Sequence, residues 1–176
     1  MRRMTSAIVT GTAIAALLTA CGSGGDSNDN PSVRPPMKVA ALGPFVGECG
    51  GVTDDEVRDI GGLGQISATY KNSVGCNWQA SGIGGASVTF ASYRGSPLGR
   101  ERAWVTAQGR NPETIDVGGH SGFQDATANG DICDLAVQLG DDFFEWSTSS
   151  GLFSSGNADP CAKNRKLAEL TVQRLK

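Results

Sequence analysis

Four consecutive residues specify a reaction by their types and spacing: Leu18, Thr19, Ala20 and Cys21. They match a bacterial lipobox position by position, in which a diacylglycerol group is joined to the cysteine thiol through a thioether. Arg2 and Arg3 supply the positive start of a signal, and the apolar run after them is too short to span a membrane. We therefore expect residues 1–20 to be a lipoprotein signal peptide and Cys21 to carry the lipid. The alternative is an ordinary secretory signal with a coincidental cysteine.

A lipid on Cys21 would place the rest of the chain on the extracytoplasmic face of the cell membrane. Two acyl chains, such as palmitate, hold a protein durably, whereas one holds it only marginally. Residues 22–42 are rich in Gly, Ser, Asp, Asn and Pro, so we expect a flexible tether that spans about 25 Å. The expected organisation is the lipidated cysteine and tether at 21–42, followed by a single domain at 43–176.

The remaining cysteines are expected to form disulfides, because the compartment outside the membrane is oxidising. Three pairings are possible among Cys49, Cys76, Cys133 and Cys161. We favour Cys49–Cys76 and Cys133–Cys161, since each pair joins a helix-side segment to a nearby strand. The competing interpretation is a zinc site, but these cysteines lack the short spacing of a zinc knuckle and the chain has one histidine. We therefore expect no metal and no cofactor.

The stretch 119–122 (GHSG) resembles a hydrolase motif only in part. A nucleophile elbow reads Gly-x-Ser-x-Gly at a strand-to-helix turn, and Phe123 stands where the last glycine belongs. A serine triad also needs a histidine from elsewhere, whereas His120 is the single histidine of the chain. A Ser-Lys pair stays open, although no pattern points to one. We interpret the stretch as a hairpin with His120 and Ser121 on alternate faces.

Arginines around the second expected helix could receive an anionic ligand. The candidate ligand surface comprises Arg94, Arg100, Arg102 and His120. Glu101 lies among these arginines, so a solvated face with local ion pairs is the alternative interpretation.

Composition restricts the remaining choices. The chain has 176 residues and a net charge of −3, and its charges are scattered, so it offers no basic stripe for nucleic acid. This length supports one domain with one core. The 25 glycines predict many turns and short elements.

The elements that position these residues are expected in the order helix, two strands, helix, four strands, helix. The helices are expected from Thr53 as N-cap to Gly61, from Ser96 as N-cap to about Ala107, and at 161–175. Strands are expected at 74–79, 86–93, 113–117, 120–126, 131–139 and 143–149. Hairpin connections predict an α+β domain, with an antiparallel sheet of about six strands, three flanking helices and two disulfides. Trp78, Trp104 and Trp146 are expected to be buried or half-buried.

Several stretches resemble a known group of lipoproteins: 47–51 (GECGG), 71–78 (KNSVGCNW), 93–102 (YRGSPLGRER), 119–123 (GHSGF) and 141–147 (DDFFEWS). They are similar to mycobacterial LprB-type lipoproteins, within the actinobacterial DUF3558-type family. Its hallmarks are a lipobox, an early cysteine, a Cys-x-Trp strand and two later cysteines. The resemblance implies an envelope lipoprotein with an α+β domain similar to PsbP/Mog1-like sandwiches. It assigns no catalytic residue, and carries over only Cys21 and the four paired cysteines.

The sequence thus favours a non-enzymatic, lipid-anchored envelope protein. Its expected partners are the membrane, through the anchor, and an unidentified envelope protein or small ligand, but not nucleic acid. The alternatives are an envelope hydrolase and a small-ligand or lipid carrier.

Overall fold

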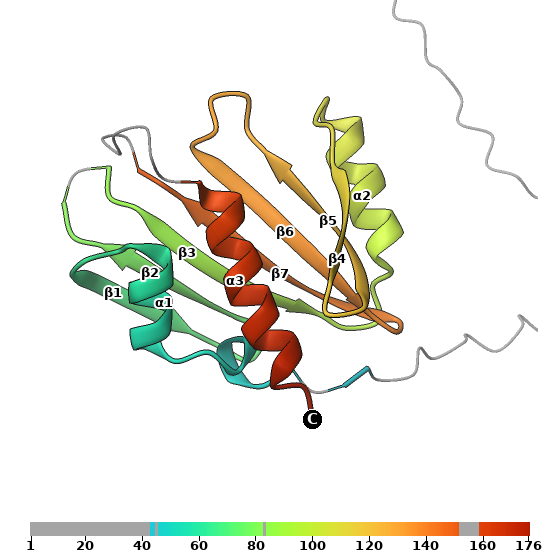
Figure 1. Cartoon of the computed structure of the whole chain (residues 1–176), viewed down its shortest axis with the longest axis horizontal. Coiled ribbons are helices and arrows are strands. Elements are labelled where there is room, and N and C mark those ends of the chain that lie inside the picture. The colour runs from blue at the N-terminus through green and yellow to red at the C-terminus, as the bar shows by residue number, and fades with distance from the viewer. Residues whose placement is uncertain (1–42, 45, 83, 152–158) are drawn as a thin grey trace, which may run out of the picture. The chain divides into compact units, whose positions relative to one another are not determined.

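The computed structural model describes residues 43–44, 46–82, 84–151 and 159–176. These residues form one sheet with its helices (Figure 1). The expected signal peptide at 1–20, the lipidation site Cys21 and the expected tether lie outside the described residues. They therefore stay predictions from the sequence.

Seven antiparallel strands form the sheet, in the order β1-β2-β3-β7-β6-β5-β4. The strands are β1 (Ile66–Lys71), β2 (Gly75–Ala80), β3 (Ser87–Tyr93), β4 (Glu113–Val117), β5 (His120–Ala126), β6 (Ile132–Leu139) and β7 (Asp142–Ser149). The helices are α1 (Asp54–Gly61), α2 (Leu98–Ala107) and α3 (Pro160–Gln173), with a short 3-10 helix η1 (Glu48–Gly51) before α1. β7 joins the two halves of the sheet by pairing with both β3 and β6. The predicted α+β class is confirmed.

The prediction of about six strands is one strand short, because no sequence pattern marks β1. This edge strand pairs only with β2, and none of its six residues is buried. A strand that is buried on neither face needs no alternation of apolar and polar residues. Its pairing with β2, from Ile66 to Lys71, is what defines it.

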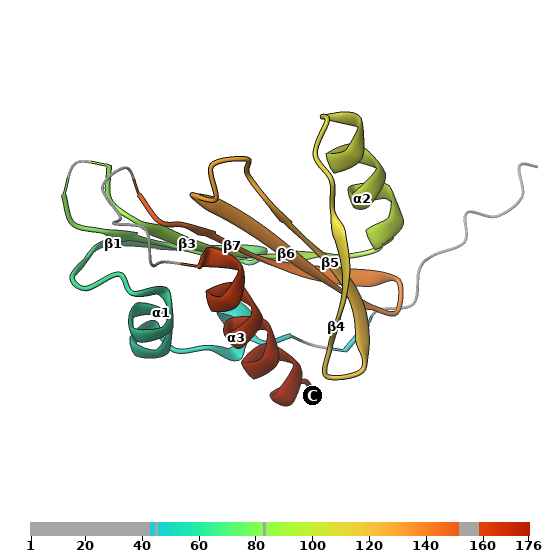
Figure 2. The ribbon, with the colours of Figure 1, turned by 45° about the horizontal axis from the view of Figure 1, so that its top comes forward.

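Helices cover the two faces of the sheet unequally (Figure 2). On one face, α1 and α3 pack over the main core, where Trp78 and Trp146 are fully buried with their ring centroids 6.0 Å apart. On the other face lies α2, which packs over β5 and β6. The second, smaller core there consists of Leu98, Val105, Phe123, Ala136 and Phe143. We call the part of this second face that lies beside α2 the open face.

Trp104 departs from the expected burial of the tryptophans. It is 61% exposed on α2, so the prediction that it would be buried or half-buried is wrong. The reason is that α2 buries only Leu98 and Val105, two turns apart, and thus touches the sheet along a narrow stripe.

The first helix begins as its sequence predicts. Thr53 Oγ1 accepts a hydrogen bond from the Glu56 backbone N–H at 3.3 Å, and the Glu56 carboxylate accepts one from the Thr53 N–H at 2.9 Å. Gly62 closes the helix in a left-handed conformation. This capping box is encoded within ten residues, which is why the sequence alone reveals it.

The second helix begins differently from the prediction. Ser96 is not its N-cap; the helix begins at Leu98, and Pro97 occupies the cap position without a side-chain hydrogen bond. Gln138 Oε1, from β6, accepts the hydrogen bond of the Leu98 N–H at 3.0 Å. The cap therefore comes from a distant strand, which frees Ser96 for another contact.

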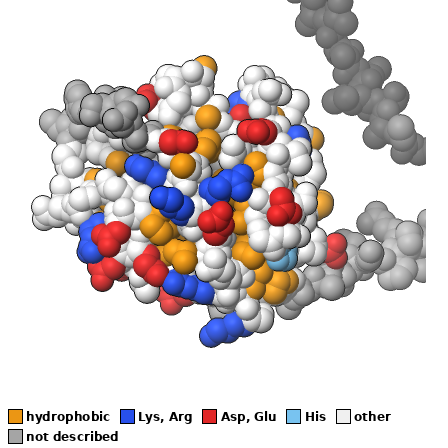
Figure 3. Space-filling model, viewed as in Figure 1, with side chains coloured by type: hydrophobic (Ala, Val, Ile, Leu, Met, Phe, Trp, Pro, Cys, Tyr) orange, Lys and Arg blue, Asp and Glu red, His pale blue; other side chains and the backbone are white. Residues whose placement is uncertain are grey.

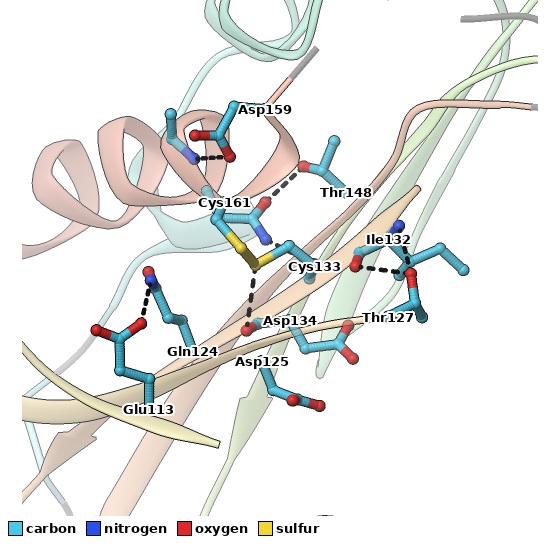
Figure 4. Close-up of a disulfide and its surroundings, with 12 residues drawn as sticks. Glu113, Gln124, Asp125, Thr127, Ile132, Cys133, Asp134, Thr148, Asp159 and Cys161 are labelled. Atoms are coloured by element: carbon cyan, nitrogen blue, oxygen red, sulfur yellow. Dashed lines mark hydrogen bonds between the residues drawn. A yellow bond between two sulfur atoms is a disulfide. The ribbon is translucent and has the colours of Figure 1, made fainter. Parts of the chain in front are cut away.

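Both disulfides have the pairing that the sequence favours: Cys49–Cys76 and Cys133–Cys161. Figure 4 shows the second of them, which ties β6 to the first turn of α3. Asp159 caps this helix by accepting a hydrogen bond from the Ala162 N–H at 3.0 Å.

Candidate functional site

A groove opens at one end of the sheet, between the β1–β2 turn and the β3–α2 loop. It consists of two pockets, of about 280 Å³ and about 540 Å³, that share Val74, Ser92 and Arg94. We call the two pockets together the β3-end groove, and distinguish the smaller inner pocket from the larger outer pocket. Their size is in the range of sites that hold small ligands.

The β1–β2 turn forms one wall of the β3-end groove. Asn72 Oδ1 accepts hydrogen bonds from the backbone N–H groups of Val74 and Gly75, both at 2.9 Å. A side chain at Gly75 would not fit, because its Cβ would lie 2.5 Å from the Phe90 carbonyl oxygen. The turn is therefore tightly specified, and it presents Val74 with 61% of its surface exposed.

Asp142 stabilises the opposite wall of the β3-end groove, which the β3–α2 loop forms. Its buried carboxylate accepts hydrogen bonds from the Gly95 N–H at 2.7 Å and from the Gly43 N–H at 2.8 Å. Arg94 Nη1 lies 3.4 Å from the same carboxylate. One side chain thus fixes the β3–α2 loop, the first described residue of the domain, and a guanidinium that lines the groove.

Two of the four residues of the candidate ligand surface meet in the β3-end groove. Arg94 and Arg100 both line the outer pocket. Arg100 Nη2 donates a hydrogen bond to Ser96 Oγ at 2.7 Å, which holds its guanidinium against the pocket wall. Both arginines are exposed, so their remaining N–H groups are accessible from solvent.

Arg102 and His120 do not line this groove. Arg102 donates hydrogen bonds to Thr114 Oγ1 at 2.7 Å and to the Pro112 carbonyl oxygen at 2.9 Å, so it ties α2 to the start of β4. Residues two positions apart on a helix point to different sides, and this separates Arg102 from Arg100. His120 lies in the β4–β5 hairpin, where Val117 is its cross-strand partner.

A row of polar side chains crosses the open face beside the β3-end groove. In the order of the strands it consists of Tyr70, Asn77, Thr89, Ser147, Asp134 and Asp125. Ser147 Oγ donates to Asp134 Oδ1 at 2.5 Å. Arg110 pairs with Asp134 at 2.7 Å and also with the buried Asp125. The acidic end of the row is therefore partly neutralised.

Glu145 lies in the adjacent row of the open face. Its cross-strand partners, Ala91 and Ala136, offer its side chain no hydrogen bond. Burial raises the pKa of Glu145 to about 7, and the charges of Asp134 and Glu101 add to the rise. The Glu145 carboxyl group therefore titrates near neutral pH.

Tyr93 connects the open face to the β3-end groove. Its ring stacks on Phe143, with centroids 4.3 Å apart, and lines the outer pocket. Its proximity partly offsets the rise in the pKa of Glu145. Burial, together with the charges of Glu145 and Glu101, raises the pKa of Tyr93 to about 12, so the hydroxyl keeps its proton.

The predicted hairpin around His120 is present. Gly118 and Gly119 both have positive φ, which the two-residue turn requires. His120 is half-buried and Ser121 exposed. Within the described ranges no hydrogen bond joins their side chains, and Asp116, the cross-strand partner of Ser121, accepts instead from the Gly119 N–H.

Sequence reasoning missed both Asp142 and Glu145. Asp142 looks like an ordinary turn residue, but its partners Gly43 and Gly95 lie 99 and 47 positions away in the chain. Glu145 did leave a signal, since it stands between the aromatic residues Phe144 and Trp146 in an alternating strand. A carboxylate at such a position must face solvent or a covering element.

Other site types find little support in the part of the chain that the structure describes. No three His, Cys, Asp or Glu side chains gather there in a way that could hold a metal ion. The cysteines described are all bound in disulfides. None of the helices described is long and apolar enough to cross a membrane.

The described residues define a disulfide-bonded α+β domain with a groove at one end of a seven-stranded antiparallel sheet. The sequence profile of the family described as "Protein of unknown function (DUF3558)" matches residues 16–174. The chain belongs to this family, as its sequence motifs indicate.

Curated relatives of the chain are mycobacterial. "Putative lipoprotein LprB" of Mycobacterium tuberculosis (strain ATCC 25618 / H37Rv) is 39% identical over 159 residues, which cover 85% of this chain and 84% of the relative. The protein of the same name from Mycobacterium leprae (strain TN) is 38% identical over 112 residues, or 61% of this chain and 60% of the relative. No solved structure matches the chain significantly, so the likeness to PsbP/Mog1-like sandwiches stays a prediction.

Proposed function

We propose that this chain is a lipid-anchored protein of the cell envelope whose domain binds an anionic group in the β3-end groove without catalysing a reaction. The observation that carries the proposal is the outer pocket, where Arg94 and Arg100 stand beside the apolar side chains of Val74 and Tyr93. Guanidinium groups match carboxylate and phosphate oxygens in geometry as well as in charge. The lipoprotein name of the relatives supports the anchor.

The long contact between Arg94 and Asp142 favours a role for Arg94 in ligand binding over a purely structural role. Asp142 already accepts two backbone hydrogen bonds at 2.7 and 2.8 Å, and Arg94, at 3.4 Å, is the most distant of its partners. A guanidinium held in this way is oriented but keeps donors for a second anion. Arg100 likewise uses one donor on Ser96 and keeps others for a ligand.

Binding can be measured by calorimetric titration of the purified protein with glycerol phosphate. Arg100→Gln should weaken binding about tenfold, because it removes one charge-assisted hydrogen bond. Arg102→Gln is a matched control from the same helix, since Arg102 is engaged with Thr114 and should leave affinity unchanged. Equal losses in both variants, or equal binding by all three proteins, would count against the groove.

The anchor is tested at Cys21. Cys21→Ala should abolish the diacylglyceryl mass on the mature N-terminus and release the protein from the membrane fraction, because the thiol is the only covalent point of attachment proposed. Ser23→Ala, two residues further on, should change neither property. Unchanged mass and membrane retention in the Cys21 variant would rule out lipidation.

A hydrolase is the second candidate function, and Glu145 is the observation that favours it. A carboxyl group with a pKa of about 7, beside Asp134 and the protonated Tyr93 hydroxyl, has the properties of a general acid. Purified protein would then turn over an ester, peptide or glycan substrate. Such turnover should disappear in Glu145→Gln and persist in Glu169→Gln, an exposed position on α3, and it would refute the non-enzymatic proposal.

A further inference from the structure

We infer that the anionic group bound in the β3-end groove is the phosphate headgroup of phospholipids in the membrane that holds the anchor, so that the domain docks on the bilayer by this end of its sheet. The inference rests on the proposed lipid anchor and on the proposed anion site. It names the source of the anion as the bilayer itself.

The exposed apolar side chains are the first argument. Antiparallel pairing brings together the C-terminal ends of β1 and β3 and the N-terminal end of β2. Of the five large hydrophobic side chains exposed among the described residues, three lie at or near these ends: Tyr70, Val74 and Tyr93, with 62%, 61% and 38% of their surface exposed. Tyrosine rings are favoured at the level of lipid headgroups, because they are apolar with a polar tip.

The distribution of charge is the second argument. The residues that line the outer pocket include Arg94 and Arg100 but no acidic side chain; Glu101 and Glu145, whose charges act on Tyr93, lie outside this lining. Glu48 lines the inner pocket, and Asp141 is exposed in the β6–β7 turn. Because both carboxylates would be repelled by an anionic surface, we expect the contact with the membrane at the outer pocket. The face that carries α1 and α3 differs, since basic and acidic side chains intermix there (Figure 3).

The path of the chain is the third argument. Gly43, the first described residue, is hydrogen-bonded to Asp142, whose carboxylate also contacts Arg94. The 21 residues between Cys21 and Gly43 therefore join the domain beside the groove. An anchor on the same chain gives an effective concentration of about the millimolar range, at which even a weak contact is populated.

The test is amide hydrogen exchange on the full lipidated chain in two kinds of vesicle. One contains phosphatidylglycerol with phosphatidylcholine, and the other contains phosphatidylcholine alone. Amides at 73–75 and 93–96 should be protected only on the anionic vesicles. Arg94→Gln combined with Arg100→Gln should lower the ratio of docked to undocked protein about 30-fold and abolish this protection, since two basic residues near an anionic surface contribute about that factor.

Arg102→Gln should keep the protection, and unchanged exchange of the β6 amides will show that each variant is folded. Arg100→Gln alone spares the contact between Arg94 and Asp142 and should lose protection partially. Equal protection on both vesicles, or on neither, would overturn the proposal. So would saturation of the groove by millimolar inorganic phosphate in the presence of anionic vesicles, because the anion would then come from solution.

The same preparations distinguish a failure of the docking inference from a failure of the lipid anchor or of the anion site on which it rests. If Cys21→Ala stays in the membrane fraction with unchanged mass, the anchor itself is wrong. If the chain is lipidated and binds glycerol phosphate, but its groove amides exchange freely on anionic vesicles, only the docking inference fails.

Discussion

The two disulfides close loops of nearly equal length, and this allows a quantitative test of how they stabilise the domain. Cys49 and Cys76 are 27 positions apart, and Cys133 and Cys161 are 28 apart. If a disulfide acts by restricting the unfolded chain, each should contribute about 3.5 kcal/mol to the free energy of unfolding. The loops do not overlap in sequence, so the two contributions should add.

These magnitudes are large compared with the stability of a domain of this size. Removing one disulfide by replacing both its cysteines with alanine should lower the melting temperature by about 13 °C, from an unfolding entropy of about 2.1 cal/mol/K per residue over roughly 130 residues. Removing both should cost about 7 kcal/mol, which approaches the entire stability of many domains. We therefore expect the variant without disulfides to be unfolded or nearly so at 37 °C.

The assay is urea unfolding followed by circular dichroism, with calorimetry to obtain the melting temperatures. Reduction of the wild-type protein is the matched control, because it opens both loops without removing side-chain volume. A difference above about 1.5 kcal/mol between the two paired alanine variants would refute the reasoning, since loops of equal length would then have unequal effects. It would indicate that packing around the sulfur atoms decides the stability.

Two further predictions concern buried polar groups. Asn164→Ala should lower the free energy of unfolding by about 2–5 kcal/mol, measured by urea unfolding. Asn164 accepts a hydrogen bond from Thr148 Oγ1 at 2.5 Å and donates one to the Cys133 carbonyl oxygen at 2.7 Å, and both bonds would be lost at a buried site. The pKa of Glu145 is raised to about 7 in the folded protein, so between about pH 4.5 and 7 the folded state binds more protons than the unfolded state. The free energy of unfolding should therefore fall by on the order of 3 kcal/mol as the pH rises through that range. Glu145→Gln should remove this fall and be the more stable protein at pH 8; an unchanged pH profile would contradict the assigned pKa.

The features predicted correctly from the sequence are those that short stretches encode. The capping box of Thr53 and Glu56 and the turn at Gly118 and Gly119 each depend on residues a few positions apart. Hydrophobic alternation likewise marks β6, where Cys133, Leu135, Val137 and Leu139 are buried at every second position on one face, while Ala136 is buried on the other. Such signals survive in the sequence because the interacting groups are neighbours in the chain.

The disulfide pairing is an intermediate case. Four cysteines allow three pairings, and no spacing rule selects among them. The favoured pairing was correct because each bond joins elements that are close in sequence as well as in space: η1 with β2, and β6 with α3.

By itself, the sequence determined the α+β class and most of the elements, because each of these depends on local composition and periodicity; the lipid anchor at Cys21 stays a prediction from a similarly local pattern. Only the tertiary structure decided the site. The cap of α2 comes from Gln138, the groove wall is held by Asp142, and Arg102 is engaged by Thr114 at the start of β4. These contacts join residues that are far apart in the chain, and a single sequence carries no periodic signal of such encounters.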